Sequence, residues 1–218
     1  MVLAPDPLPV HVDAWLLVVN KPSGLLSQPG LGPDLADCVP ARLEPHWGPL
    51  YLVHRLDRDT SGLLLLARDR DCHRALSLAF ARRAVRKTYG ADVLGLPAAT
   101  AGCIDQPLAR ACQRPPLYRV DPLGRPSRTT WRLLEAHGRW SRLELQPFSG
   151  RSHQLRVHLD WLGHPILGDP LYGDERSRSL APRLRLHATG LGFVHPVTGS
   201  LLQLQSPLPW RDPCSRVG

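Results

Sequence analysis

The residues best suited to chemistry lie in one polar stretch, HRLDRDTSG at positions 54–62, which runs directly into four leucines. The spacing that begins at Asp57 matches the first half of a calcium-binding loop, but the glutamate that ends such a loop is replaced by Arg68. The aspartate pair could also belong to a phosphatase, in which an apolar strand would lead to the aspartates instead of following them. A catalytic carboxylate of another kind, with Asp57 as the candidate, is the third interpretation.

The elements that would position this stretch are mostly strands. Short apolar or alternating runs, bounded by turn residues, predict single strands and two hairpins. The strands are expected within 15–24, 62–69 and 87–95, and the hairpins over 129–148, turning at His137–Gly138, and over 189–205.

Two helices and a long connection complete the predicted elements. A helix over 72–84 would be capped by Asp71, and a second helix within 152–165 by Ser152. Residues 106–128 are rich in Pro and Arg and form a connection long enough to be either functional or disordered. This strand-rich pattern with two main helices predicts one α+β domain.

Composition describes a globular chain with a basic surface. Its 218 residues are 43% hydrophobic and 21% charged, enough for one large or two small domains. The formal net charge of +8 attracts polyanions, of which nucleic acid is the commonest inside cells. No apolar run approaches the ~20 residues of a membrane span, and the N-terminal residues lack the pattern of a secretory signal. We therefore expect a cytoplasmic protein with no membrane partner.

Cysteine and lysine usage add two expectations. The five cysteines form an odd set without a Cys-x-x-Cys pair, which predicts reduced thiols and no structural metal. Of the 27 basic residues only Lys21 and Lys87 are lysines. In a chain so rich in arginine, these two positions are expected to need a compact ammonium, which the planar guanidinium of arginine cannot imitate.

The motifs of the whole chain, taken in order, resemble those of the RluA family of pseudouridine synthases. HRLDRDTSG is similar to the family's HRLD-x-x-TSG signature, and the stretch at 150–173 is similar to its second signature. One further block departs from the family's pattern by Ser127, where a small alanine is usual. The matching blocks are VVNKPSGLLSQPG (18–30), HRLDRDTSG (54–62), RKTYGADVLG (86–95), GRPSRT (124–129), GRSHQLRVHLDWLGHPILGDPLYG (150–173) and APRLRLHA (181–188).

The resemblance implies a single pseudouridine synthase catalytic domain over 14–207, between an N-terminal tail, 1–13, and a C-terminal tail, 208–218. Its fold would be α+β, with a mixed, mostly antiparallel sheet flanked by helices and loops. Such an enzyme cuts the N1–C1′ bond of a uridine in RNA, rotates the uracil and rejoins it through C5. The uracil is both leaving group and nucleophile, so no cofactor and no metal are expected.

The resemblance also implies the roles of the catalytic residues. Asp57 corresponds to the catalytic aspartate, which attacks C1′ or promotes elimination to a glycal; both routes stay open. Arg156 corresponds to the arginine that keeps this carboxylate ionised against the loss of hydration in a closed pocket. Tyr89 corresponds to the tyrosine that packs on the uracil and is the candidate base at C5. Asp59 matches a variable position and is expected to be a turn or surface residue.

The expected RNA contacts surround these residues. The target base must leave its stack, and Arg55 is expected to fill the space where it was. His54 is expected to orient the loop, and Leu186 to line the base pocket. Phosphate contacts are expected from Lys21, Arg151 and the arginines at 110, 114, 119, 125 and 128.

The expected substrate is a uridine in a tRNA or 23S rRNA stem-loop. The chain is expected to lack the S4-type RNA-binding domain that many members carry, and its motifs are most similar to the branch that modifies a tRNA anticodon loop and 23S rRNA. Two alternatives stay open: a synthase acting on the acceptor and T-arm region of tRNA, and a non-catalytic RNA-binding or ribosome-assembly factor. The family implies a monomer.

Overall fold

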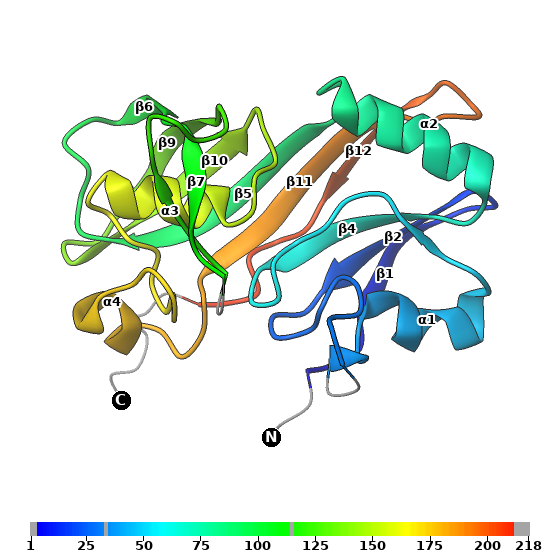
Figure 1. The fold of residues 1–218 in the computed structure, drawn as a ribbon, viewed down its shortest axis with the longest axis horizontal. Helices are drawn as coiled ribbons and strands as arrows, with labels where there is room; N and C mark the ends of the chain where they lie inside the picture. The colour runs from blue at the N-terminus through cyan, green and yellow to red at the C-terminus, as the bar shows by residue number, and fades with distance from the viewer. Residues whose placement is uncertain (1–3, 33–34, 114–115, 212–218) are drawn as a thin grey trace. The chain divides into compact units, whose positions relative to one another are not determined.

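Figure 1 shows the computed structural model of the protein, which describes residues 4–32, 35–113 and 116–211. The chain divides into two compact units. Unit 1 comprises 1–87 and 187–207, and unit 2 comprises 88–186 and 208–218. Both are rich in strands and carry helices, and the strands form antiparallel pairs and a parallel pair, which confirms the α+β class. No helix in the described part of the chain is long and apolar enough to cross a membrane.

Unit 1 is built around β4, the strand that follows the polar stretch. All seven residues of β4 (Ser61–Ala67) are buried, as the run of leucines requires. The strand pairs antiparallel with β2 on one side and parallel with β11 on the other. The strands follow the order β1 (Leu8–Val12), β2 (Leu16–Lys21), β4 and β11 (Leu186–Val194), while β3 (Tyr51–Leu52) pairs with β4 and β12 (Leu201–Gln205) pairs with β11.

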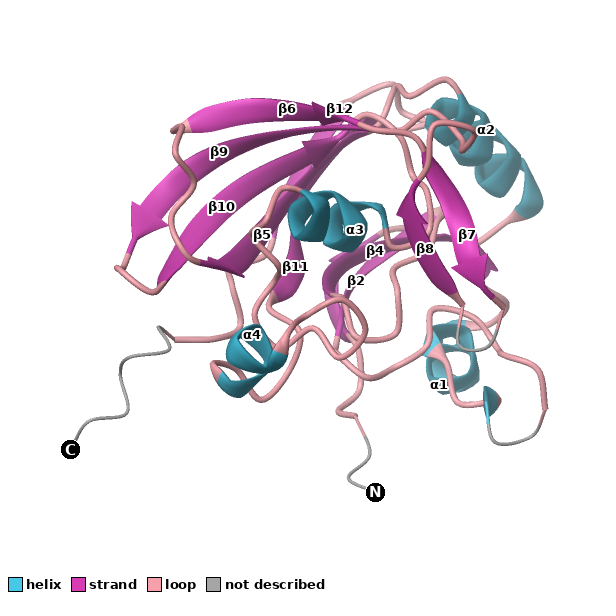
Figure 2. Ribbon diagram, turned by 60° about the vertical axis from the view of Figure 1, so that its left-hand side comes forward, coloured by secondary structure: helices cyan, strands magenta, loops and turns pink. Residues whose placement is uncertain are grey.

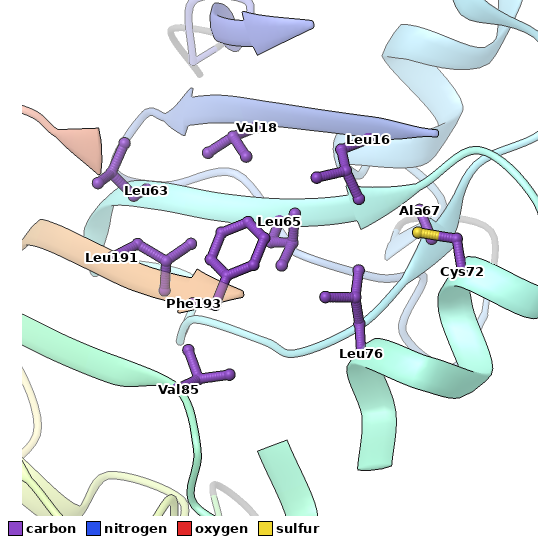
Figure 3. Packing of buried hydrophobic residues seen from close by; sticks show 10 residues of the cluster. All are labelled: Leu16, Val18, Leu63, Leu65, Ala67, Cys72, Leu76, Val85, Leu191 and Phe193. Atoms are coloured by element: carbon purple, nitrogen blue, oxygen red, sulfur yellow. The ribbon is translucent and has the colours of Figure 1, made fainter. Parts of the chain in front are cut away.

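The core of unit 1 fixes β4 through its leucine side chains. Leu63 and Leu65 pack with residues of β2 and β11 and with Leu76 of α2 (Arg70–Ala81), as Figure 3 shows. Each fully buried leucine contributes about 1.5–3 kcal/mol to stability. The strand that leaves the polar stretch is therefore a rigid support. A separate helix, α1 (Val39–Trp47), buries Val39 and Leu43.

Unit 2 contains an antiparallel run of strands with a helix over its face (Figure 2). The strand order is β5 (Arg86–Leu94), β10 (Trp140–Pro147), β9 (Arg128–Ala136) and β6 (Ala101–Asp105). The helix α3 (Gln154–Trp161) is tied to β9, because Gln154 Nε2 donates to Thr129 Oγ1 at 3.0 Å. A shorter helix, α4 (Glu175–Ser179), follows it, and β7 (Leu108–Cys112) and β8 (Leu117–Val120) form a separate two-stranded ladder.

The predicted strands and both hairpins are confirmed, and three other expectations are corrected. The helix start expected at Asp71 lies at Asp69, whose carboxylate accepts from Cys72 N at 2.8 Å. Ser152 does not cap α3; the N-cap is His153, in the left-handed conformation at φ 56°. The connection over 106–128 is not a plain loop, since it contains the β7–β8 hairpin. The helix α1 lies in a stretch for which no element was predicted.

Both expected tails are partly ordered. Residues 8–12 form β1 on the edge of β2 instead of a free tail. At the other end, Trp210 Nε1 donates to Asp92 Oδ2 at 2.8 Å, and the indole lies near two guanidinium groups of unit 2. Asp92 is fully buried and also pairs with Arg142 and Arg185. The first residues after 207 are therefore anchored to unit 2.

Candidate active site

The loop that carries Asp57 is a tight turn held by the segment that precedes it in the chain. Within the turn, Thr60 N donates to Asp57 O at 3.1 Å. From outside, Gly24 N donates to Arg58 O at 2.9 Å, and Ser23 Oγ donates to Asp59 O at 2.7 Å. The Pro-Ser-Gly turn after β2 thus binds the backbone carbonyls of Arg58 and Asp59, the two residues that follow Asp57.

The other side of the loop is held by Ser27. Its Oγ donates to Leu56 O at 2.8 Å and accepts from Leu56 N at 3.0 Å. Both partners are buried, so these bonds are shielded from competing water. The backbone is therefore fixed immediately before and immediately after Asp57. Apart from their place in a matching block, no feature of the sequence marks Ser23 or Ser27 for this task.

Lys21 also holds the Asp57 loop, through hydrogen bonds from its ammonium group. The predicted contact of Lys21 with a phosphate is corrected. The side chain is 0% exposed, and Nζ donates to Pro22 O, Leu25 O and Arg58 O at 2.9, 2.7 and 2.9 Å. Three N–H groups of an ammonium meet three carbonyls, an arrangement that a flat guanidinium would not fit. The expectation of a compact ammonium at this position is therefore supported, while a surface role for it is wrong.

His54 orients the chain as it enters the loop. Its ring stacks on Phe80, with centroids 4.7 Å apart, and Nε2 accepts from Leu65 N at 3.1 Å. Burial, and to a smaller degree the nearby Lys87 ammonium, lower the pKa of His54 to about 3. The imidazole is therefore neutral at physiological pH and carries its proton on Nδ1. These contacts support the orienting role of His54.

The exit of the loop is fixed where β4 begins. Gly62 has φ 114°, and a Cβ there would collide with the backbone of Ala188, its parallel partner on β11. Beside it, Ser61 Oγ lies 2.8 Å from His187 Nδ1, and His187 Nε2 lies 3.0 Å from Ser206 Oγ. The motifs did not single out His187. Leu186, immediately before it, is 3% exposed.

The charged side chains of the loop differ in their surroundings. Arg55 is exposed and makes no hydrogen bond or ion pair with the residues that the structure describes. Asp59 pairs with the exposed Arg58 at 3.3 Å, which supports its assignment as a surface residue. Asp57 is half-buried. One loop thus presents an exposed cation two residues before a partly buried carboxylate.

In unit 2, Arg156 is held in a buried bidentate pair. The side chain is 2% exposed, and Nε and Nη2 donate to the two oxygens of Asp169 at 2.8 and 2.6 Å. Asp169 is itself 0% exposed and also accepts from Leu171 N and Tyr172 N. Asp169 was missed from the sequence, although it lies in a matching block, because nothing local marks a carboxylate as buried.

The remaining predicted residues of unit 2 are Tyr89, Arg151 and the arginines of the 106–128 segment. Tyr89 is 9% exposed and lies opposite Leu145 in the β5–β10 pair. Arg151 is half-buried, and its Nε is buried without an acceptor among the described residues. The arginines at 110, 119, 125 and 128 are exposed, and Arg114 lies outside the described residues.

The predicted residues therefore fall into two groups. Asp57 belongs to unit 1 with Arg55, His54 and the buried Lys21. Tyr89, Arg151, Arg156 and Leu186 belong to unit 2.

Comparison with known proteins supplies the chemical context of these groups. The profile of the family described as RNA pseudouridylate synthase matches residues 15–161. The dual-specificity RNA pseudouridine synthase RluA of Escherichia coli K12 is 40% identical over 200 residues, 91% of either chain. An RNA pseudouridine synthase of Chloroflexus aurantiacus is 44% identical over 204 residues, which cover 87% of this chain and 62% of that one.

Two solved structures share the fold. Human RNA pseudouridylate synthase domain containing 1 has a TM-score of 0.81 at 28% identity, covering 94% of this chain and 85% of its own. Human RNA pseudouridylate synthase domain containing 4 has a TM-score of 0.75 at 30% identity, covering 93% and 88%.

Proposed function

Because the chain belongs to the RNA pseudouridylate synthase family and is an RNA pseudouridine synthase, we propose that it isomerises a uridine in a tRNA anticodon loop, in 23S rRNA, or in both. The proposed catalytic carboxylate is Asp57. The observation that carries this assignment is the clamp of buried hydrogen bonds on both sides of it, from Ser27 and Lys21. A reactive group held on so rigid a support loses little orientational freedom when it reaches the transition state.

The chemistry assigned to Asp57 concerns the glycosidic bond. Its carboxylate attacks C1′ as the N1–C1′ bond breaks, or removes a sugar proton in an elimination to a glycal; in both routes the bonding electrons leave with the uracil. The uracil then turns and C5 bonds to C1′, as the ester bond between C1′ and the carboxylate breaks or, in the glycal route, as the carboxylate returns its proton to the sugar. C5 loses its proton to solvent, N1 takes one up, and the Asp57 carboxylate is regenerated.

The other site residues serve this step. Arg156 stabilises the ionised Asp57 and the charge that develops on the uracil, and Asp169 holds its guanidinium in one orientation. Tyr89 packs on the uracil; since the ordinary pKa of a tyrosine is about 10, it is a weak general base and a packing role is favoured. Arg55 enters the RNA stack in place of the extruded base.

The proposed RNA contacts lie mainly on unit 2. The half-buried Arg151 would contact a phosphate through its guanidinium group. The exposed arginines 110, 119, 125 and 128 add a sequence-independent attraction to the backbone. The dual specificity stated in the name of the Escherichia coli relative supports the proposal that this chain acts on more than one RNA.

The test uses tRNA and rRNA transcripts that carry tritium at C5 of uridine. Release of label to water by the wild type, with at least a thousandfold loss in Asp57→Asn, is expected if removing one charge removes the reacting group (a loss of about 4 kcal/mol in the barrier). Asp57→Asn should still bind RNA within a few-fold. Equal release by both proteins would remove Asp57 from its role, and no release by the wild type from any RNA would favour the non-catalytic binding factor.

The target follows from mapping pseudouridine in total RNA of cells with and without the gene. Loss of the modification from an anticodon loop or from 23S rRNA supports the proposal. Loss confined to the acceptor or T-arm region of tRNA would overturn it in favour of the alternative substrate.

A further inference from the structure

Tyr172 contacts both the β7–β8 hairpin and Arg156 of α3, two parts of unit 2 that are far apart in the sequence. Its hydroxyl accepts from Tyr118 N on β8 at 3.0 Å and lies 2.7 Å from His153 Nδ1. Its ring lies 5.2 Å from the guanidinium carbon of Arg156. One side chain thus contacts the β7–β8 hairpin at its tip and the buried arginine with its face.

The arginine end of this contact is rigid. Asp169 binds the Arg156 guanidinium through both carboxylate oxygens, and Asp169 Oδ1 also accepts from Tyr172 N at 3.1 Å. The guanidinium and the backbone that carries the tyrosine are therefore fixed by one carboxylate. A displacement of Tyr172 would be transmitted to Arg156 both through the ring and through Asp169.

The hairpin end of the contact is marginal by itself. β7 and β8 form a separate two-stranded ladder, extended by a bridge between Leu108 and Arg125, and so small a ladder has little stability in water. The hairpin is docked by Tyr118, whose ring packs edge-on against His153 at 5.4 Å, and by the bond from Tyr118 N to Tyr172. His153 adopts φ 56°, a conformation that costs a non-glycine residue free energy and tends to occur at functional sites.

The hairpin also carries exposed cations next to this docking point. The Arg110 guanidinium lies 5.8 Å from the Tyr118 ring centroid, and Nη2 lies 3.4 Å from Tyr118 Oη. A phosphate bound by Arg110 would restrain Tyr118 through these contacts. The contacts then continue from Tyr118 to Tyr172 and from Tyr172 to Arg156.

We propose that Tyr172 is a positioning residue that couples RNA binding at the β7–β8 hairpin to the orientation of the Arg156 guanidinium. The inference rests on the proposed function, in which Arg156 serves Asp57. RNA that occupies the hairpin orders it, the ordered hairpin fixes the Tyr172 hydroxyl, and the fixed ring completes the support of Arg156. RNA that fails to engage the hairpin would reach the site with Arg156 less well held.

The first test separates affinity from rate in single-turnover label release at saturating RNA. Tyr172→Phe keeps the ring against Arg156 and removes only the hydroxyl. We expect RNA affinity within about threefold of wild type and a saturating rate about tenfold lower, because small misplacements of catalytic groups are costly. Tyr51→Phe, which removes a half-buried tyrosine hydroxyl from unit 1, is the matched control and should keep the wild-type rate. A Tyr172→Phe variant with the wild-type saturating rate would overturn the proposal.

The second test varies exposed arginines, alone and in combination with Tyr172→Phe. Arg110→Gln is expected to lower the saturating rate as well as the affinity, because Arg110 contacts Tyr118. Arg125→Gln, an exposed arginine of the same segment without that contact, is expected to weaken binding alone. In a Tyr172→Phe background the rate effect of Arg110→Gln should disappear. Equal, purely affinity-based losses in Arg110→Gln and Arg125→Gln, or additive rate effects in the double variant, would contradict the coupling.

Failure of this inference is distinguishable from failure of the proposed function. If Asp57→Asn is inactive while the tyrosine and arginine variants behave as controls, the chemistry stands and the coupling falls. If Asp57→Asn keeps wild-type label release, the premise for Arg156 falls, and the coupling falls with it.

Discussion

At the scale of single residues, two aspartates that look alike in the sequence have different surroundings. The Asp59 carboxylate pairs with an exposed arginine, whereas the backbone around Asp57 is gripped from both sides. The grip depends on buried polar groups that satisfy one another. Its strength can therefore be tested by removing one of them, and Lys21 offers the largest effect because it serves three carbonyls.

Lys21→Met is expected to destabilise the protein by about 2–4 kcal/mol, since it leaves buried carbonyl oxygens without donors. Lys21→Arg should also destabilise it, because a longer planar group must enter a fully packed site. Urea unfolding at pH 7 measures both. Arg58→Gln, at an exposed position on the same loop, is the control and should stay within about 0.5 kcal/mol of wild type. An unchanged midpoint in Lys21→Met would contradict the clamp.

His54 makes stability depend on pH with a definite sign. Burial lowers its folded-state pKa to about 3, below the ordinary value of about 6.5 in the unfolded chain. Between these values the unfolded state binds a proton that the folded state does not, so stability falls as the pH drops from about 6.5 toward about 3, by at most ~1.4 kcal/mol per pH unit.

The measurement compares the free energy of unfolding of wild type and His54→Asn between pH 7 and pH 4.5. The restriction to this range keeps most carboxylates ionised. The His54→Asn variant should lose less stability on acidification, and His158, whose pKa burial also lowers, contributes equally to both proteins. Parallel curves for the two proteins would show that His54 is not held neutral.

At the scale of elements, the parallel pairing of β4 with β11 sets where the loop ends. Gly62 occupies a position of this pair where the backbones meet without room for a side chain. Gly138, at the turn of the β9–β10 hairpin, also has a positive φ, but a Cβ added there would meet no other atom within 4 Å. Substituting the two glycines therefore separates two costs in stability: that of a positive φ, which both positions share, and that of a collision between the new Cβ and Ala188, which only Gly62 would meet.

Gly138→Ala is expected to cost about 1 kcal/mol, the penalty of a left-handed alanine. Gly62→Ala should cost several kcal/mol, because the β4–β11 pair must also move apart. Thermal unfolding measures both. Label release should fall in Gly62→Ala even below its melting temperature, since the end of the Asp57 loop shifts with the strand. Equal melting temperatures for the two variants would show that β11 moves to make room for the new Cβ at little cost in stability.

The elements that could be predicted from the sequence were those with a recognisable order of apolar and polar residues. The leucine run of β4 is visible because all seven of its residues are buried, and β5 was found from its alternating residue types, although five consecutive residues of this strand are buried. The helix α1 was missed because it carries Pro45 in its interior and has little apolar periodicity. The β7–β8 hairpin was missed because it is held by tertiary contacts of Tyr118, which no local pattern records.

The sequence motifs identified most residues of the site, but they did not predict what each residue contacts or how deeply it is buried. The motifs selected Lys21 and Arg156, but burial decides that the first is a support and that the second has Asp169 as a partner. Side-chain burial depends on residues far apart in the chain. Ser27 and Asp169 therefore had no signal of their own, although both lie within matching blocks.

At the scale of the whole molecule, the net charge of +8 and the exposed arginines predict RNA affinity that falls steeply with salt. Each phosphate neutralised by the protein contributes about 0.7–0.9 to the slope of log affinity against log salt concentration, because bound counterions are released. The slope therefore counts ionic contacts instead of total charge. A matched pair of variants can show which arginines contribute.

Arg119→Gln should reduce the magnitude of this slope by about 0.7–0.9, if Arg119 contacts one phosphate. Arg132→Gln is the control: it removes the same charge from an equally exposed arginine, and both arginines form a surface ion pair, with Asp121 and Glu144 respectively. Filter binding of a tRNA transcript between 50 and 300 mM salt, about the range in which such slopes are linear, gives the three values. Equal slopes for the two variants would assign the attraction to net charge alone and remove the 106–128 segment from the RNA-binding surface.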